Sequence, residues 1–151
     1  MKQAIAIARL EDTPFYAMDK AIKSYRQFAQ SNIRVNNMDI TIDQWLVLKT
    51  VSDHPDMTQK EMAQKVFKDH ASITRIIEIL VKRDYLTRSF NDEDRRRYKL
   101  RLTKKGSRIY ENLMPIVQYN RSTALNGISD QEISDLRRIL NKIIHNCSRE
   151  N

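Results

Sequence analysis

Residues 57–106 constrain the fold of this chain most, because they predict two short amphipathic helices followed at once by a strand, a charged loop and a second strand. The first helix begins at Thr58, and Glu61 lies three positions further on, so the two side chains can form a capping box. The second helix covers about residues 69–83. Its apolar side chains follow the helical period and predict one buried stripe: Ile73, Ile76, Ile77, Leu80 and Val81.

The same segment ends in two predicted strands, residues 86–90 and 98–102, joined by a short charged loop. The loop consists of Asn91, Asp92, Glu93, Asp94, Arg95, Arg96 and Arg97. Two helices followed by a hairpin with an arginine-rich tip indicate a winged helix-turn-helix, whose second helix can enter the major groove of DNA. We therefore predict a mainly α fold with a small β-hairpin wing.

The second helix carries polar side chains on the face opposite its apolar stripe. They include Ser72, Thr74 and Arg75, which can reach base edges or phosphates. Arg75 could bind guanine through two hydrogen bonds or only clamp a phosphate, and the sequence leaves both interpretations open. Thr58 and Gln59, at the start of the preceding helix, are candidates for phosphate contacts, although Thr58 also fits plain helix capping.

The positive charge of the chain is concentrated on this part. The sequence contains 27 Lys and Arg against 19 Asp and Glu, a net charge of +8. Residues 82–108 hold eleven of the basic residues and four of the acidic ones, so most of the excess lies in this short stretch. A scattered excess would indicate only a solvated surface. A cluster on one helix end and its wing instead favours double-stranded DNA as the partner.

The rest of the composition argues against several other classes of protein. No run of apolar residues approaches the roughly 18 that a membrane span needs, and the first residues do not resemble a signal peptide, so we expect a cytoplasmic protein without membrane contact. The single cysteine, Cys147, fits a reducing compartment. In the apolar pattern of the last helix it is interpreted as a small buried hydrophobe rather than a redox sensor.

Neither a metal centre nor an enzymatic site is indicated. The three histidines, His54, His70 and His145, lie far apart and lack carboxylate or thiol companions at ligand spacing. There is no glycine-rich phosphate loop and no recognisable nucleophile with its base. We expect no cofactor and no catalysis.

The flanking segments predict further helices. Residues 13–32 have apolar spacings of three and four, and two more capping boxes are predicted at Thr41 with Gln44 and at Ser129 with Glu132. The terminal helices carry apolar seams that the small central lobe could hardly cover. We therefore predict a homodimer in which residues 1–32 and 107–151 of two subunits interleave around a DNA-binding lobe of residues 33–106. The alternative is an intramolecular bundle in a monomer.

From about Tyr16 to Cys147 the sequence resembles the MarR family of winged-helix transcription regulators. The most specific part is Asp94-Arg95-Arg96, followed by a strand and then Leu102-Thr103-Lys104-Lys105-Gly106. Residues 43–48 and 73–80 are similar to the family's supporting and recognition helices. One departure concerns the turn after the recognition helix, which usually holds a glycine. Here Asp84 would have to adopt a left-handed conformation.

The resemblance implies that the recognition helix enters the major groove, that the terminal helices dimerise and that an arginine of the wing enters the minor groove. That arginine would be Arg96, oriented by Asp94, with Arg95 and Arg97 beside it. Arginine is favoured where a narrow minor groove concentrates negative potential. The family also binds phenolic or lipophilic effectors. Tyr25, Phe28 and Trp45 could line a pocket for such an aromatic or lipophilic molecule, although aromatic residues at helical spacing more often belong to a core.

These observations lead to one principal hypothesis, a homodimeric transcription regulator that binds a palindromic operator as a repressor and is released by a small-molecule effector. An alternative is a winged-helix interaction module whose basic wing binds an acidic protein.

Overall fold

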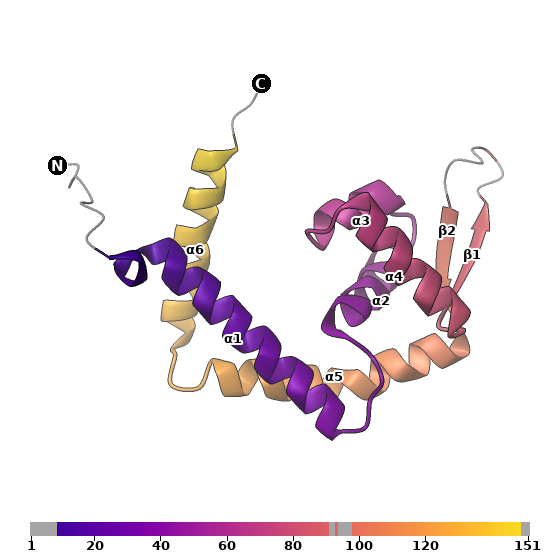
Figure 1. Ribbon diagram of the computed structural model, residues 1–151, viewed down its shortest axis with the longest axis horizontal. Helices are drawn as coiled ribbons and strands as arrows, with labels where there is room; N and C mark the ends of the chain where they lie inside the picture. The colour runs from indigo at the N-terminus through magenta and orange to yellow at the C-terminus, as the bar shows by residue number, and fades with distance from the viewer. Residues whose placement is uncertain (1–8, 91–92, 94–97, 149–151) are drawn as a thin grey trace. The chain divides into compact units, whose positions relative to one another are not determined.

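The structure, a computed structural model, describes residues 9–90, 93 and 98–148 (Figure 1). A short 3-10 helix, Leu10–Asp12, precedes the regular elements. They are α1 Pro14–Val35, α2 Ile42–Asp53, α3 Gln59–Lys65, α4 His70–Lys82, β1 Leu86–Phe90, β2 Tyr98–Leu102, α5 Lys104–Ala124 and α6 Asp130–Cys147. The predicted mainly α fold with a β-hairpin wing is confirmed. The chain divides into two compact units, residues 1–120 and 121–151.

The helices begin where local capping signals predict. Three helices begin with a capping box: Thr41 with Gln44, Thr58 with Glu61, and Ser129 with Glu132. In each box the hydroxyl of the first residue accepts from the backbone amide of the second, and the side chain of the second accepts from the backbone amide of the first. Asp69 caps α4 by accepting from the amide of Ser72. At the start of α5, the hydroxyl of Thr103 accepts from the amide of Gly106 at 2.9 Å. Because each cap satisfies orphan amides, these helices have sharply defined beginnings.

Three helices end at residues with a left-handed backbone. Asn37 after α1, Phe67 after α3 and Asp84 after α4 have φ angles of 57°, 58° and 61°. The expected left-handed conformation of Asp84 is therefore confirmed. Asn and Asp adopt this conformation more readily than other side chains, whereas a bulky residue such as phenylalanine is a genuine outlier there.

One hydrophobic core holds the first unit together. The apolar stripe of α4 contributes Ile73, Ile77 and Leu80, all fully buried, while Ile76 and Val81 are half-buried against the same core. The other buried contributors come from α1, the segment before α2, α2, α3, the wing and α5: Ile33, Ile40, Trp45, Val47, Leu48, Val51, Met62, Ala63, Leu86, Leu100, Leu113 and Val117. Burying a full-size apolar side chain is worth about 1.5–3 kcal/mol, so the core fixes α4 by one face and leaves the opposite face at the surface.

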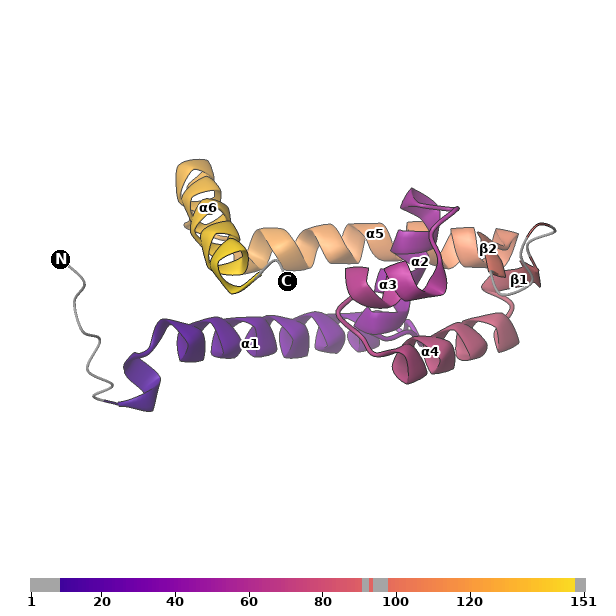
Figure 2. The same ribbon diagram turned by 90° about the horizontal axis from the view of Figure 1, so that it is seen from above.

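The wing is a two-stranded antiparallel hairpin that follows α4 directly (Figure 1). Leu86 pairs with Leu102 at its base, and Phe90 pairs with Tyr98 at its far end. Leu86 and Leu100 are buried and anchor the hairpin to the core. Figure 2 shows α2, α3, α4 and the hairpin gathered along the first part of α5.

Helix α5 packs closely against the turn that joins α4 to the wing. A Cβ atom on Gly106 would lie 2.0 Å from the carbonyl oxygen of Tyr85, so only glycine fits this contact. Further along α5, Tyr110 stacks on Trp45 of α2 with ring centroids 6.3 Å apart. Near its end, the carbonyl oxygen of the buried Asn120 side chain accepts from the side-chain amide of Asn32 of α1 at 2.7 Å.

The second unit contains the last turn of α5 and all of α6. None of the described α6 side chains is buried in the single chain. Leu136, Ile139 and Ile144 all expose about half or more of their surface. The expectation that Cys147 is buried is wrong, since this last residue of α6 is exposed in the single chain.

Candidate nucleic-acid interface

The helix-turn-helix brings two predicted contact residues together. The side-chain amide of Gln59, in the first turn of α3, donates to the hydroxyl oxygen of Thr74 on α4 at 2.6 Å. The Thr74 hydroxyl donates in turn to the carbonyl of His70 at 2.9 Å. This chain of hydrogen bonds fixes both half-buried side chains at the junction of the two helices. The hydroxyl keeps a second lone pair that a base amine could approach.

Ser72 is committed to capping its own helix. Its amide and its hydroxyl both donate to the Asp69 carboxylate, at 2.8 Å and 2.9 Å. The backbone hydrogen bond and then the side-chain hydrogen bond from Ser72 lower the pKa of Asp69. The carboxylate therefore stays ionised at neutral pH beside the start of α4. Ser72 can meet DNA as an acceptor, because its proton is engaged.

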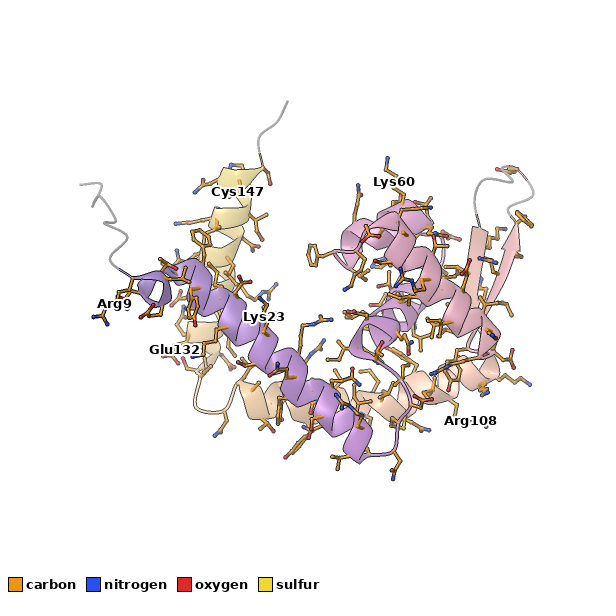
Figure 3. The ribbon with its side chains drawn as sticks, in the orientation of Figure 1. Arg9, Lys23, Lys60, Arg108, Glu132 and Cys147 are labelled. Atoms are coloured by element: carbon orange, nitrogen blue, oxygen red, sulfur yellow. The ribbon has the colours of Figure 1, made fainter. Side chains whose placement is uncertain are left out.

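Arg75 lies one residue after Thr74 and is exposed. Within the part of the chain that the structure describes, its guanidinium makes no hydrogen bond or ion pair. It can therefore bind an external group without first breaking a contact. Lys60 extends from the neighbouring helix α3 (Figure 3) and is exposed as well. Together they place positive charge on the surface that α3 and α4 share.

Several cations of the basic stretch instead hold the lobe together. Arg83, at the end of α4, donates to the carbonyl oxygen of Asp39 at 2.7 Å. Arg101 of β2 donates to the carbonyl oxygen of Pro55 at 2.9 Å. Lys105 donates to the carbonyl of Arg83 at 3.2 Å, and its ammonium lies 5.3 Å from the ring centroid of Tyr85. The charge excess counted in the sequence therefore overstates the charge that faces a partner.

The tip of the wing carries the other predicted contacts. Asp94, Arg95, Arg96 and Arg97 lie outside the described residues.

An ionic bridge that the sequence analysis missed connects α1 to the turn before α4. The Asp43 carboxylate, in the first turn of α2, pairs with Arg26 of α1 and with Lys68, the latter at 3.0 Å. Partial burial alone would raise the pKa of Asp43, but hydrogen bonds from Arg26 and Lys68, and their positive charges, outweigh it and lower the pKa. The ionised carboxylate thus links a predicted dimerisation helix to the base of the recognition helix.

The three aromatic residues considered for an effector pocket lie in two environments. Trp45 is only 4% exposed and belongs to the core, whereas Tyr25 and Phe28 are half-buried on α1. A cavity of about 360 Å³ is lined by other residues, among them Gln30 and Arg34 of α1, Gln44 of α2 and Arg83. The effector site stays a prediction.

Across residues 9–90, 93 and 98–148, no group of His, Cys, Asp or Glu side chains is arranged to hold a metal ion. In the same residues, no helix is long and apolar enough to cross a membrane.

The chain is similar to known proteins in sequence. The family model described as "MarR family" matches residues 40–98, which run from just before α2 to the first residue of β2. A curated relative, the uncharacterized HTH-type transcriptional regulator YybA of Bacillus subtilis (strain 168), is 24% identical over 120 residues, which are 80% of each chain.

Solved structures share the fold. A cysteine-to-serine mutant of MarR from Escherichia coli, solved in complex with operator DNA, matches with a TM-score of 0.77 and 22% identity over 85% of this chain and 91% of its own. BpsR of Bordetella bronchiseptica, whose DNA binding is regulated by 6-hydroxynicotinic acid, matches with a TM-score of 0.80 and 21% identity over 89% and 95%. PcaV of Streptomyces coelicolor, in complex with its natural ligand, matches with a TM-score of 0.81 and 19% identity. The match covers 95% of this chain and 100% of PcaV.

Proposed function

This chain belongs to the MarR family of DNA-binding transcription regulators, and we propose that it is a homodimeric repressor that binds a palindromic operator and leaves it when a small-molecule effector binds. Such a role places it in the cytoplasm.

The observation that carries the proposal is the exposed face of α4. Its apolar face is fixed in the core, so Thr74 and Arg75 are held outward, with Gln59 bonded beside them. A rigid helix presenting a hydroxyl, an amide and a guanidinium suits the donors and acceptors of the major groove. We assign base or phosphate contacts to Arg75 and Thr74, phosphate contacts to Thr58 and Gln59, and to Ser72 the role of an acceptor for a base amine, since its protons are engaged by Asp69.

The wing completes the proposed interface. Arg96 enters the minor groove, Asp94 orients it, and Arg95 and Arg97 contact the neighbouring phosphates. Arginine suits this role because a narrow minor groove concentrates negative potential.

Exposed apolar side chains support the proposed dimer. Leu136, Ile139 and Ile144 on α6, and Phe15 and Ile22 on α1, are exposed in the single chain. Unpaired apolar helix faces of this kind are typical of subunit interfaces. We propose that residues 1–32 and 107–151 of two copies cover them by interleaving, which sets the spacing of two recognition helices.

Release by an effector requires a molecule that binds one spacing of the lobes better than the other. BpsR is regulated by 6-hydroxynicotinic acid, and PcaV was solved with its natural ligand. By analogy we propose an aromatic or lipophilic effector for this chain, near Tyr25, Phe28 and Trp45.

The proposal is tested by selecting duplexes from a random library, about three helical turns long, with the purified protein and measuring affinity as salt rises. Several phosphate contacts should make log K fall linearly with log salt, by about 0.9 per contact. The double variant Arg95→Ala, Arg96→Ala should bind much more weakly while it remains folded. Selection that enriches no duplex, or binding that is indifferent to salt, would contradict a role in DNA binding.

A further inference from the structure

Phe67 combines a strained backbone with an exposed ring. It follows α3, where its amide donates to the carbonyl of Gln64 at 3.3 Å and the amide of Lys68 donates to that of Ala63 at 2.8 Å. This Schellman arrangement places Phe67 at the position that usually holds glycine. Its φ is 58° and its side chain is 93% exposed. The protein therefore bears both a conformational cost and the cost of an apolar ring in water.

The other two left-handed helix ends show that the cost is avoidable. Asn37 and Asp84 occupy the same position after α1 and α4, and both are residue types that tolerate positive φ. A glycine or asparagine at position 67 would close α3 equally well. Because the exposed ring adds nothing to the core, the fold itself does not explain the phenylalanine. Strained residues of this kind cluster at sites of function.

The position of Phe67 indicates what the ring meets. It lies two residues before Asp69, the N-cap of α4, and so at the base of the helix that we assign to the major groove. Lys65 precedes it by two residues and Lys60 lies on the same short helix, while the neighbouring Lys68 pairs with Asp43. Lysine is depleted in the centre of protein interfaces, whereas an apolar ring among lysines suits a duplex, which offers phosphates beside thymine methyl groups.

We propose that Phe67 is a specificity residue that packs against the 5-methyl group of a thymine at the edge of the major groove in each half-site. This inference rests on the proposed function, since it presupposes that α4 reads DNA. It adds a preference for thymine at one symmetric pair of positions, set by an apolar contact rather than by hydrogen bonds.

The test compares Phe67→Asn and Phe67→Ala with the parent, using a duplex selected by the parent protein. Val35→Ala is the matched control, since Val35 is also an exposed apolar residue but lies at the end of α1. Phe67→Asn should raise the melting temperature by about 2–4 °C, because asparagine relieves the left-handed strain. Both Phe67 variants should bind the duplex about five- to tenfold more weakly. Val35→Ala should bind like the parent.

Two further readouts separate the thymine contact from other roles. The salt dependence of binding should keep its slope in the Phe67 variants, since no phosphate contact is lost. Replacing single thymines of the duplex by uracil removes only the methyl group. Uracil at the contacted pair should weaken the parent severalfold and leave Phe67→Ala unaffected.

The outcomes distinguish this inference from the proposed function. If the parent selects no duplex, the proposed function fails and the inference falls with it. If the parent selects a duplex but the Phe67 variants bind it equally well, or uracil weakens parent and Phe67→Ala alike, only the thymine contact is overturned. It is also overturned if sedimentation shows that Phe67→Asn weakens self-association, because the ring would then pack against a second copy of the chain.

Discussion

Replacing Gly106 by alanine should destabilise the lobe, although alanine is the better helix former. A Cβ atom there would lie 2.0 Å from the carbonyl oxygen of Tyr85 and 2.9 Å from its carbonyl carbon. The oxygen cannot simply retreat, because it accepts from the amide of Thr103 at 3.1 Å, while the amide of Tyr85 donates to Leu80 at 2.9 Å. The overlap must therefore move α5 away from the turn between α4 and the wing.

The size of the effect follows from three contributions. Overpacking a close contact costs about 1–3 kcal/mol, and weakening the Thr103 hydrogen bond costs about 1 kcal/mol more. The higher helix propensity of alanine offsets about 1 kcal/mol. The net loss is about 2 kcal/mol, which corresponds to a fall in melting temperature of about 4–8 °C for a chain of this size.

The assay is urea and thermal denaturation followed by circular dichroism, with Gly127 as the matched control. Gly127 has a φ of 80°, and a Cβ atom there would meet nothing within 4 Å. Gly127→Ala should lose only about 1 kcal/mol through the left-handed backbone, and Gly127→Asn should recover most of that loss. A Gly106→Ala protein as stable as the parent would refute the reasoning, because the contact with Tyr85 would then be readily relieved.

Three other predictions concern α4, the ionic bridge and the contact between α1 and α5. Arg75→Ala should weaken duplex binding by about tenfold or more and leave the urea midpoint unchanged, because Arg75 has no partner among the described residues; an unaltered affinity would remove Arg75 from the interface. Asp43→Asn should cost about 1 kcal/mol at pH 7 by breaking the pairs with Arg26 and Lys68. The pKa of Asp43 in the folded protein lies below 3.8, so its contribution to stability is present above pH 3.8 and is lost as the pH falls through the folded pKa. The urea midpoints of parent and variant should therefore converge at low pH. A difference between them that stays constant well below pH 3.8 would contradict the bridge. Asn120→Ala should cost about 1–3 kcal/mol, because Asn120 is 1% exposed and its loss leaves the Asn32 amide without that acceptor; a thermal melt that matches the parent would count against this.

Features that depend on residues close together in the sequence could be predicted. The capping boxes at Thr41, Thr58 and Ser129 need only residues three positions apart, and the structure contains all three. The left-handed Asp84 followed from the family pattern, in which a glycine stands at that position. The observed bounds of the two strands agree with the predicted ones, because the apolar residues at the strand ends and the charged loop mark both boundaries.

Features that depend on contacts between distant segments could not be predicted. Spacing alone does not reveal that Arg83 and Arg101 bond to backbone carbonyls 44 and 46 residues away, so both were counted as free charge. The bridge from Asp43 to Arg26 and Lys68 needs three separate elements to meet. Phe67 was missed for a different reason, since phenylalanine is not a turn signal and the left-handed end of α3 contradicts its local preference.

The central claim is that two copies of α4 read successive major grooves, and methylation protection of a selected duplex tests it most directly, since guanine N7 lies in the major groove. We predict two protected clusters related by two-fold symmetry, with centres about 10 base pairs or a multiple of that apart, and loss of both clusters with Arg75→Ala. Protection of a single cluster, or a bound duplex whose guanines all remain reactive at N7, would contradict the account.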